Sequence, residues 1–258
     1  MVVAQVDTQL HPIDDAGYIA ACKEQLDGNG VLVLDGFFRP EAVSQIVAES
    51  KLAERDVFYA GSTHNVYLTP PDPSLPDDHP FNRQVVSSKG LIADDQVPDT
   101  SPLRAVYDAT SFRSFLCGVL GIDAIYPYAD SLSSINVHFA GVGRELGWHF
   151  DNSSFAVTML LQKPAGGSRF EYVPDVRDAD AGEMGFEKVE AVLDGQAEVA
   201  TLEFEPGALV LFRGRNAMHR VTPTEGDITR LLAVFAYNDK PDVQLSDSAL
   251  KTFFGRTS

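Results

Sequence analysis

Residues 147–173 read GWHFDNSSFAVTMLLQKPAGGSRFEYV, and short apolar runs alternate with turn residues along this stretch. The runs at 155–162 and 168–173 have the length of strands, and KPAGG between them predicts a hairpin turn at Gly166 and Gly167. Two antiparallel strands are therefore expected here, directly after the sequence His-Phe-Asp.

Similar strand patterns recur on both sides of this hairpin. Apolar segments of strand length, separated by glycine, proline and aspartate, lie at 133–139, 199–205, 208–212, 217–221 and 229–237. About eight short strands in the second half of a chain predict an antiparallel jelly roll.

The beginning of the chain has a helical pattern instead. A helix at 13–30 is predicted to start at Asp14 or Asp15 and to stop at Gly28. A short apolar strand is predicted at 31–38.

Further helices are predicted before the strands. One lies at 39–56 and has a proline at its start, and one or two lie at 102–121, ending at Gly118 or Gly121. Residues 60–102 are rich in proline and aspartate, which predicts a long excursion that serves as a lid or a binding loop.

The order of these elements predicts one domain that is mainly β with N-terminal helices. A jelly-roll core at 125–240 would be buttressed by α-helices and a lid segment within 1–124, with a helix or tail at 241–258. A length of 258 residues fits a single domain of this type, and a hydrophobic content of 44% can fill its core.

Composition and charge exclude several classes of partner. The net charge of −17 would repel nucleic acid or an anionic membrane. No apolar run approaches the roughly 20 residues of a membrane span, and the N-terminus does not resemble a signal peptide. Cys22 and Cys117 are expected to be free thiols. We expect a soluble, cytoplasmic protein that acts on a small molecule, with a homodimer left open.

His149 and Asp151 are the first candidates for chemistry. Residues two apart in a strand face the same side, so these two would project together while Phe150 projects away. A metal site needs a third ligand. The other histidines of the chain are His11, His64, His79, His138 and His219. His219 lies in another predicted strand, which a jelly roll can place beside the first.

Two imidazoles and one carboxylate on one face leave three positions of an octahedral metal open. This arrangement suits a ferrous ion that must also hold a co-substrate and oxygen, whereas zinc is more often tetrahedral with one open position. His149, Asp151 and His219 are therefore predicted to be the metal ligands and the catalytic residues.

Arg230 starts the apolar segment that comes after His219. A guanidinium at the start of a buried strand offers a fixed, bidentate cation to a carboxylate. Ferrous iron with one aspartate and two neutral imidazoles has one positive charge. A bound 2-oxoglutarate dianion would leave one negative charge, which Arg230 would neutralise.

These residues carry a family resemblance. GWHFDNSSF at 147–155, PGALVLFRGRNAMHRV at 206–221 and Arg230 together resemble the iron(II)/2-oxoglutarate-dependent oxygenases, and GNGVLVLDGFFRPEAV at 28–43 resembles their usual entry into the fold. The resemblance spans roughly residues 125–240. It implies a double-stranded β-helix, the cupin-like jelly roll, with Fe(II), 2-oxoglutarate and O2 as cofactors and ascorbate as an optional reductant.

A narrower resemblance concerns free-amino-acid hydroxylases and their relatives, the radical halogenases. It rests on DDHPFNRQVVSS at 77–88, YPYADSL at 126–132, GWHFDNSSF and GGSRFEYVP at 166–174. The halogenases replace the metal-binding carboxylate by glycine or alanine, so that chloride can occupy the vacant position. Asp151 fills that position here, so the resemblance implies hydroxylation of an unactivated C–H bond in an amino acid or a derivative.

Two other outcomes stay open at this point. The same cofactors also support desaturation, epimerisation or cyclisation, because these reactions differ only in the steps after hydrogen abstraction. A protein of another class, a jelly roll that binds a metal or a small ligand without turnover, has the same strand pattern.

Candidates for contact with the cofactor lie on two predicted strands. Asn136 and His138 are two residues apart and share a face, although a structural hydrogen bond explains them equally well. Thr158 is a candidate donor to a carboxylate of 2-oxoglutarate.

Candidates for substrate binding are Arg83, His64 and Phe253. The resemblance implies an arginine near position 83 that holds the substrate carboxylate; an ordinary surface arginine is the alternative. His64 would line the lid, and Phe253 would close the pocket unless it belongs to a packed terminal helix. No acidic residue stands where it would face a substrate ammonium group, which disfavours a lysine-like substrate.

Overall fold

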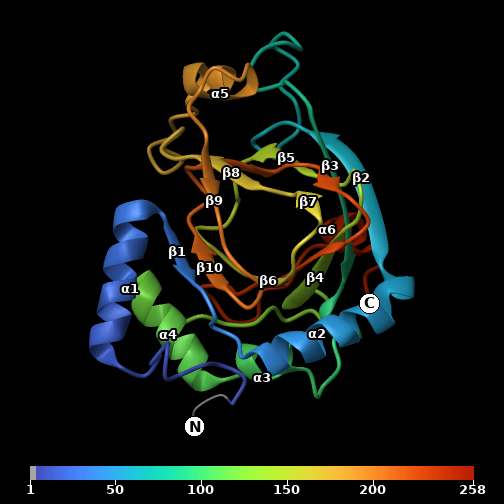
Figure 1. Ribbon diagram of the computed structural model, residues 1–258. Coiled ribbons are helices and arrows are strands. Elements are labelled where there is room, and N and C mark those ends of the chain that lie inside the picture. Colours follow the sequence, from blue (N-terminus) through green and yellow to red (C-terminus); the bar gives the residue numbers. More distant parts are fainter. Residues whose placement is uncertain (1–3) are drawn as a thin grey trace.

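The computed structural model describes residues 4–258, and its centre is a large antiparallel sheet that curls into a ring (Figure 1). This architecture confirms the predicted mainly β class. The strands are β1 (Val31–Leu34), β2 (Phe58–His64), β3 (Val85–Ile92), β4 (Ile135–Ala140), β5 (Leu146–His149), β6 (Ala156–Gln162), β7 (Gly166–Gly167), β8 (Phe170–Val173), β9 (Ala200–Leu202), β10 (Leu209–Phe212), β11 (Met218–Val221), β12 (Thr224–Glu225) and β13 (Arg230–Phe235).

The order of strands in the sheet brings distant parts of the chain together. The path runs β1-β10-β6-β13-β4-β3-β5-β11-β8-β9, with β2 paired to β3, and β7 and β12 form a separate pair. β5 and β11 are neighbours although about 70 residues separate them, and His219 lies opposite His149. The expected placement of the two histidines is confirmed.

The two faces of the sheet carry different side chains. In β4, Ile135, Val137 and Phe139 belong to the main hydrophobic core, which the helices complete from outside the ring. Asn136 and His138 alternate with them and therefore face the inside of the ring. A second apolar cluster, which includes Leu160 and Phe170, lines part of this inner face.

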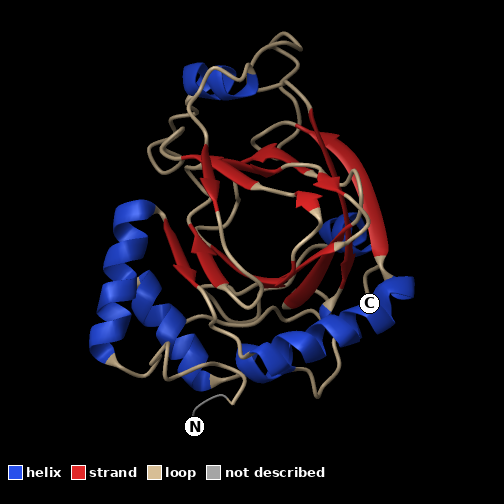
Figure 2. Cartoon of the chain, in the orientation of Figure 1, coloured by secondary structure: helices blue, strands red, loops and turns tan. Residues whose placement is uncertain are grey.

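Four helices cover part of the outer face of the sheet (Figure 2): α1 (Ala16–Asn29), α2 (Pro40–Ala53), α3 (Pro102–Tyr107) and α4 (Thr110–Leu120). Two more helices, α5 (Phe186–Leu193) and α6 (Asp247–Phe254), pack in separate apolar clusters, and short 3-10 turns lie at Glu54–Asp56 and Asp94–Gln96. The buttress of N-terminal helices and the C-terminal helix agree with the sequence-based expectation. α5 was not expected, because its segment lies in the strand-rich half of the chain.

The ends of α1 and α4 are set by capping residues. The side chain of Asp15 accepts a hydrogen bond from Tyr18 N, which selects Asp15 as the N-cap. α1 ends at Gly30, whose φ of 70° is left-handed, so the predicted stop at Gly28 was wrong by two residues. α4 ends at Gly121, also at φ 70°, and Gly118 lies inside the helix.

The expectation of an excursion over residues 60–102 was wrong in its extent. β2 and β3 lie largely within this segment and pair along their whole length, so only residues 65–84 form the connecting loop. These strands were missed because consecutive polar residues and glycine, GSTH in β2 and SSKG in β3, interrupt the apolar alternation. The sheet also begins before residue 125, since β1 to β3 all belong to it.

The segment KPAGG is not a simple hairpin turn. Gly166 and Gly167 form β7, which pairs with Thr224 and Glu225 of β12. A Cβ on Gly167 would lie 2.0 Å from the carbonyl oxygen of Pro223, so this close approach of two backbones requires glycine.

Two further expectations concern the chain as a whole. Cys22 and Cys117 are free thiols, as predicted. Within residues 4–258 no helix is both long enough and apolar enough to cross a membrane.

Candidate metal centre

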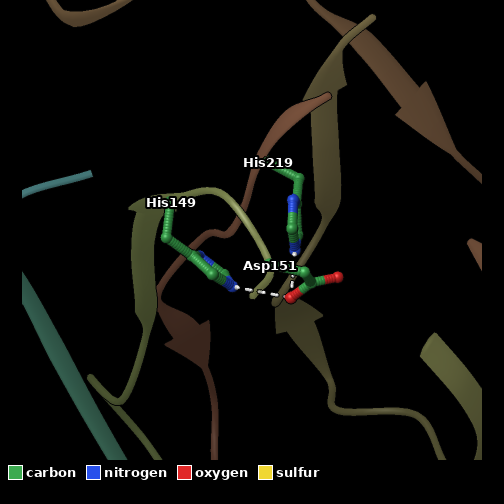
Figure 3. A group of neighbouring side chains, drawn as sticks. All are labelled: His149, Asp151 and His219. Atoms are coloured by element: carbon green, nitrogen blue, oxygen red, sulfur yellow. Dashed lines mark ion pairs between the residues drawn. The ribbon is translucent and has the colours of Figure 1, made fainter. Parts of the chain in front are cut away.

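His149, Asp151 and His219 converge on one point, with the carboxylate between the two imidazoles (Figure 3). Asp151 Oδ1 lies 3.9 Å from His149 Nε2 and 3.5 Å from His219 Nε2. One ligand atom from each residue lies within 4.8 Å of the other two. Ligands of a single cation at bond lengths near 2 Å are roughly 3–4 Å apart, so the spacing fits a shared metal ion.

The strand that carries His149 ends earlier than the sequence predicted. β5 stops at His149, because the next two residues leave the ladder: Phe150 N donates to Val66 O, and Asp151 N donates to Gly214 O. The alternation of side chains nevertheless continues, and Phe150 packs on the opposite side in a separate apolar cluster. Asp151 therefore still faces the same side as His149.

Each histidine is held with one nitrogen free for a metal. His149 Nδ1 lies 2.8 Å from Gly147 O, and His219 Nδ1 lies 3.1 Å from Ala217 O. A carbonyl oxygen only accepts hydrogen bonds, so both Nδ1 atoms carry the proton. Both Nε2 atoms are then left with a lone pair, which is the usual arrangement for ligand histidines.

The charge states also suit a cation. Burial and the neighbouring His219 lower the pKa of His149 far below its usual range, so this imidazole is neutral at pH 7. Burial alone would raise the pKa of Asp151, but its contact with His219 and the nearby positive charges outweigh burial and lower that pKa. The site presents a neutral His149 and an ionised carboxylate beside His219.

One carboxylate oxygen of Asp151 lacks a hydrogen-bond partner among residues 4–258. This oxygen, Oδ2, is also buried. Buried acceptors are almost always satisfied, and a cation is one way to satisfy a carboxylate. Together with the donor set, this oxygen indicates that the residues present fit a divalent metal with open coordination positions.

The absence of a side chain at Gly214 leaves space for the carboxylate of Asp151. A Cβ at this position would lie 2.0 Å from Asp151 Oδ2 and 2.8 Å from His219 Cε1. Sequence reasoning missed Gly214, because nothing in FRGRN distinguishes this close approach from an ordinary turn glycine.

Arg177 supports the segment that carries Asp151. Its guanidinium lies 4.1 Å from the ring centroid of Phe150, and Nε donates to Arg215 O at 2.7 Å. A longer contact of 3.5 Å reaches Asp151 O. This residue, which the sequence did not single out, ties the 151–152 segment to the loop before β11.

Arg230 lies at the start of β13, as predicted, and is buried. Burial is the only cause that lowers its pKa, to about 10, and no carboxylate of residues 4–258 pairs with it. It borders a cavity of about 150 Å³ that Phe170 and Leu160 also line. A buried guanidinium without a partner is prepared to bind an anion.

The cofactor candidates on β4 and β6 all lie on inward-facing positions. His138 stands opposite Leu232 in β13, and Thr158 opposite Val234. Burial, together with the charges of Lys89 and Arg230, lowers the pKa of His138 well below its usual range. The side chain of Asn136 donates to Leu132 O at 3.1 Å, so it makes the structural hydrogen bond considered as the alternative.

One of the three substrate candidates, His64, lies beside a metal ligand. The ring of His64 lies 6.3 Å from that of His149, and its Nε2 bonds Ser87 Oγ at 2.6 Å. Arg83 Nη1 instead pairs with Asp194 Oδ1 at 2.7 Å. Phe253 is 45% exposed.

Comparison with known proteins identifies a family and a fold. A family model described as HalD, Halogenase D, matches residues 78–252. No curated protein matches the chain.

Solved structures with a similar fold share little sequence. An oxidoreductase of the 2OG-Fe(II) oxygenase family from Burkholderia pseudomallei has a TM-score of 0.56 at 12% identity, with 88% of this chain and 93% of that chain covered. The α-ketoglutarate-dependent epimerase SnoN from nogalamycin biosynthesis has a TM-score of 0.59 at 12% identity, with 86% and 81% covered. AviO1 from Streptomyces viridochromogenes Tue57 has a TM-score of 0.54 at 15% identity, with 88% and 97% covered. At these identities the likeness establishes the fold, a double-stranded β-helix.

Proposed function

The chain belongs to the halogenase D family, and from this premise we propose that it is an iron(II)- and 2-oxoglutarate-dependent oxygenase that hydroxylates an unactivated C–H bond. The substrate would be a small molecule related to a free amino acid. The observation that supports hydroxylation is the carboxylate of Asp151, which stands with His149 and His219 where a halogenase would have a side chain too small to bind metal.

His149 Nε2, Asp151 and His219 Nε2 would hold the iron. Bound iron(II) would supply the activation of O2, with 2-oxoglutarate converted to succinate and CO2 and one oxygen atom delivered to the substrate. The two imidazoles are oriented before any ligand arrives, because each Nδ1 is held by a backbone carbonyl. Asp151 contributes the single negative charge of the ligand set.

Arg230 would anchor the far carboxylate of 2-oxoglutarate. Its charge is buried and unpaired, so the carboxylate would meet a fixed bidentate donor whose desolvation is already complete. Apolar rings pack beside the metal ligand: those of Phe170 and Phe212 lie 5.6 and 4.9 Å from the ring of His219.

The direct test measures turnover with candidate substrates. The protein with Fe(II), 2-oxoglutarate and O2 is incubated with a panel of free amino acids and their derivatives. Succinate release should accompany gain of one oxygen atom by one substrate, measured by mass spectrometry. A chain that forms no visible charge-transfer band with anaerobic Fe(II) and 2-oxoglutarate, and no succinate, would instead be a binding protein.

Replacing Asp151 by glycine is expected to lower hydroxylation on the order of 100-fold or more, because one of three metal ligands is lost. The product is analysed with and without chloride, since the vacant position is the one a halide would take. Asp99→Gly is the control, because the Asp99 side chain is fully exposed. Hydroxylation at the wild-type rate in the Asp151 variant would exclude Asp151 as a ligand.

Arg230→Met is expected to raise the KM for 2-oxoglutarate by roughly 100-fold, because a charge-assisted bidentate contact is lost while side-chain volume is kept. The measurement is the rate of succinate formation against 2-oxoglutarate concentration. Arg55, whose side chain is 85% exposed, provides the matched control Arg55→Met. An unchanged KM in the Arg230 variant would show that another group binds the far carboxylate.

A further inference from the structure

Lys89 lies near the middle of β3, on the inner face of the sheet. It stands opposite Ala60 in β2, and its neighbour on the same face, Leu91, stands opposite His138 in β4. Gly90 points the other way, toward Tyr59, where a Cβ would overlap the ring. The register therefore turns Lys89 toward the same interior as His138.

The ammonium group of Lys89 has no partner. Among residues 4–258 it makes no hydrogen bond and no ion pair; burial lowers its pKa to about 8, and the charge of Asp151 is the only influence that opposes burial. The side chain is nevertheless only partly buried by accessible surface. A group that is desolvated yet still reachable by a small molecule lines an interior space and is not packed against other side chains.

The charges on the inner face do not balance without a second anion. Asp151 is the carboxylate that influences Lys89, and the metal would use it. Iron(II), Asp151 and Arg230 together have two positive charges, which a 2-oxoglutarate dianion neutralises. The positive charge of Lys89 then remains in a desolvated place, where an uncompensated ion is costly.

We propose that Lys89 binds a carboxylate of the primary substrate, so that this site selects a carboxylate over the corresponding amide. This inference rests on the proposed function, since it assigns the substrate end of the same site. A single negative charge restores neutrality. Within residues 4–258 Asp151 is the only acidic group that influences Lys89, so once the metal uses it no carboxylate of the chain is left there to neutralise the lysine.

Neighbouring groups connect Lys89 to the metal centre. Ser87 is two residues away on the same face, and its Oγ lies 2.6 Å from His64 Nε2 and 3.0 Å from Gly147 N. His64 in turn is the ring beside His149. A carboxylate held at Lys89 would thus extend its carbon chain past Ser87 and His64 toward the metal ligands.

The arginine expected to hold the substrate carboxylate is already neutralised. Arg83 pairs with Asp194 beside the end of α5, and both side chains are partly exposed to solvent. Its charge is compensated within the chain, whereas that of Lys89 is not. We therefore assign binding of the substrate carboxylate to Lys89 and not to Arg83.

The experiment compares matched carboxylates and amides on the holoenzyme. Protein loaded anaerobically with Fe(II) and 2-oxoglutarate is titrated with aliphatic L-amino acids, their N-acetyl derivatives, and the corresponding primary amides. Binding is followed through the change in the visible charge-transfer band. In the wild type, at least one carboxylate should bind roughly 10- to 100-fold more tightly than its amide.

Lys89→Met should abolish this preference and leave the affinity for 2-oxoglutarate within about threefold of wild type. Lys89→Arg should retain the preference, and Lys51→Met, at an exposed position of α2, should match the wild type in every respect.

Three results would overturn the assignment of Lys89. The first is that the wild type binds no carboxylate more tightly than its amide, and the second is that the preference survives in Lys89→Met. The third is that Lys89→Met weakens the binding of 2-oxoglutarate instead, which would make the lysine part of the cofactor site. Absence of the charge-transfer band in the wild type would reject the proposed oxygenase function itself, and the Lys89 assignment with it.

Discussion

A His149→Ala variant is expected to lose succinate formation by about 1000-fold or more and to bind iron(II) weakly. Alanine removes one of three protein ligands, and the remaining pair, Asp151 and His219, cannot fix a metal with open positions on one face. A loss of this size corresponds to about 4 kcal/mol of transition-state stabilisation. Succinate formation and iron(II) titration measure the two effects separately.

The fold should survive this substitution. The side chain of His149 bonds only Gly147 O within its own strand, and the apolar cluster on the opposite face of β5, which includes Trp148 and Phe150, is untouched. An unchanged thermal melting curve in the presence of chelator would confirm this. His79→Ala, at a histidine outside the triad, should keep wild-type turnover. Retained turnover in His149→Ala would exclude the proposed ligand set.

The metal ligands were predictable because two simple regularities converge on them. Residues two apart in an extended segment share a face, which joins His149 to Asp151 even though β5 itself ends at His149. The antiparallel jelly roll then allowed the later strand with His219 to lie beside the first. Arg230 was predictable for a similar reason, as the charged first residue of an otherwise apolar strand.

Lys89 and Gly214 could not be found in the same way. The strand that carries Lys89 has serines at neighbouring positions, so its inner face is polar and shows no apolar alternation. Gly214 depends on an approach between its backbone and Asp151, 63 residues earlier in the chain, which no local pattern encodes. The role expected for Arg83 also depended on a distant residue, since Asp194 pairs with it across 111 positions.

Gly214→Ala is expected to weaken iron(II) binding and succinate formation on the order of 100-fold, because the carboxylate must move. The new methyl group would lie 2.0 Å from Asp151 Oδ2, well inside contact distance, and displacements near 1 Å at a catalytic group have effects of this size. The backbone of Gly214 does not have a left-handed φ, so alanine introduces no conformational strain there. The effect is therefore purely steric and local to the metal ligands.

Two comparisons isolate this steric effect. Gly28→Ala places a methyl group where nothing lies within 4 Å, so iron binding and turnover should remain at the wild-type level. In an Asp151→Gly background the clash with Oδ2 is gone and only the contact of 2.8 Å with His219 Cε1 persists, so Gly214→Ala should weaken iron binding much less there. Equal effects of Gly214→Ala in both backgrounds would show that the glycine does not act through Asp151. Full iron affinity in the single variant would show that the carboxylate has other positions from which to bind the metal.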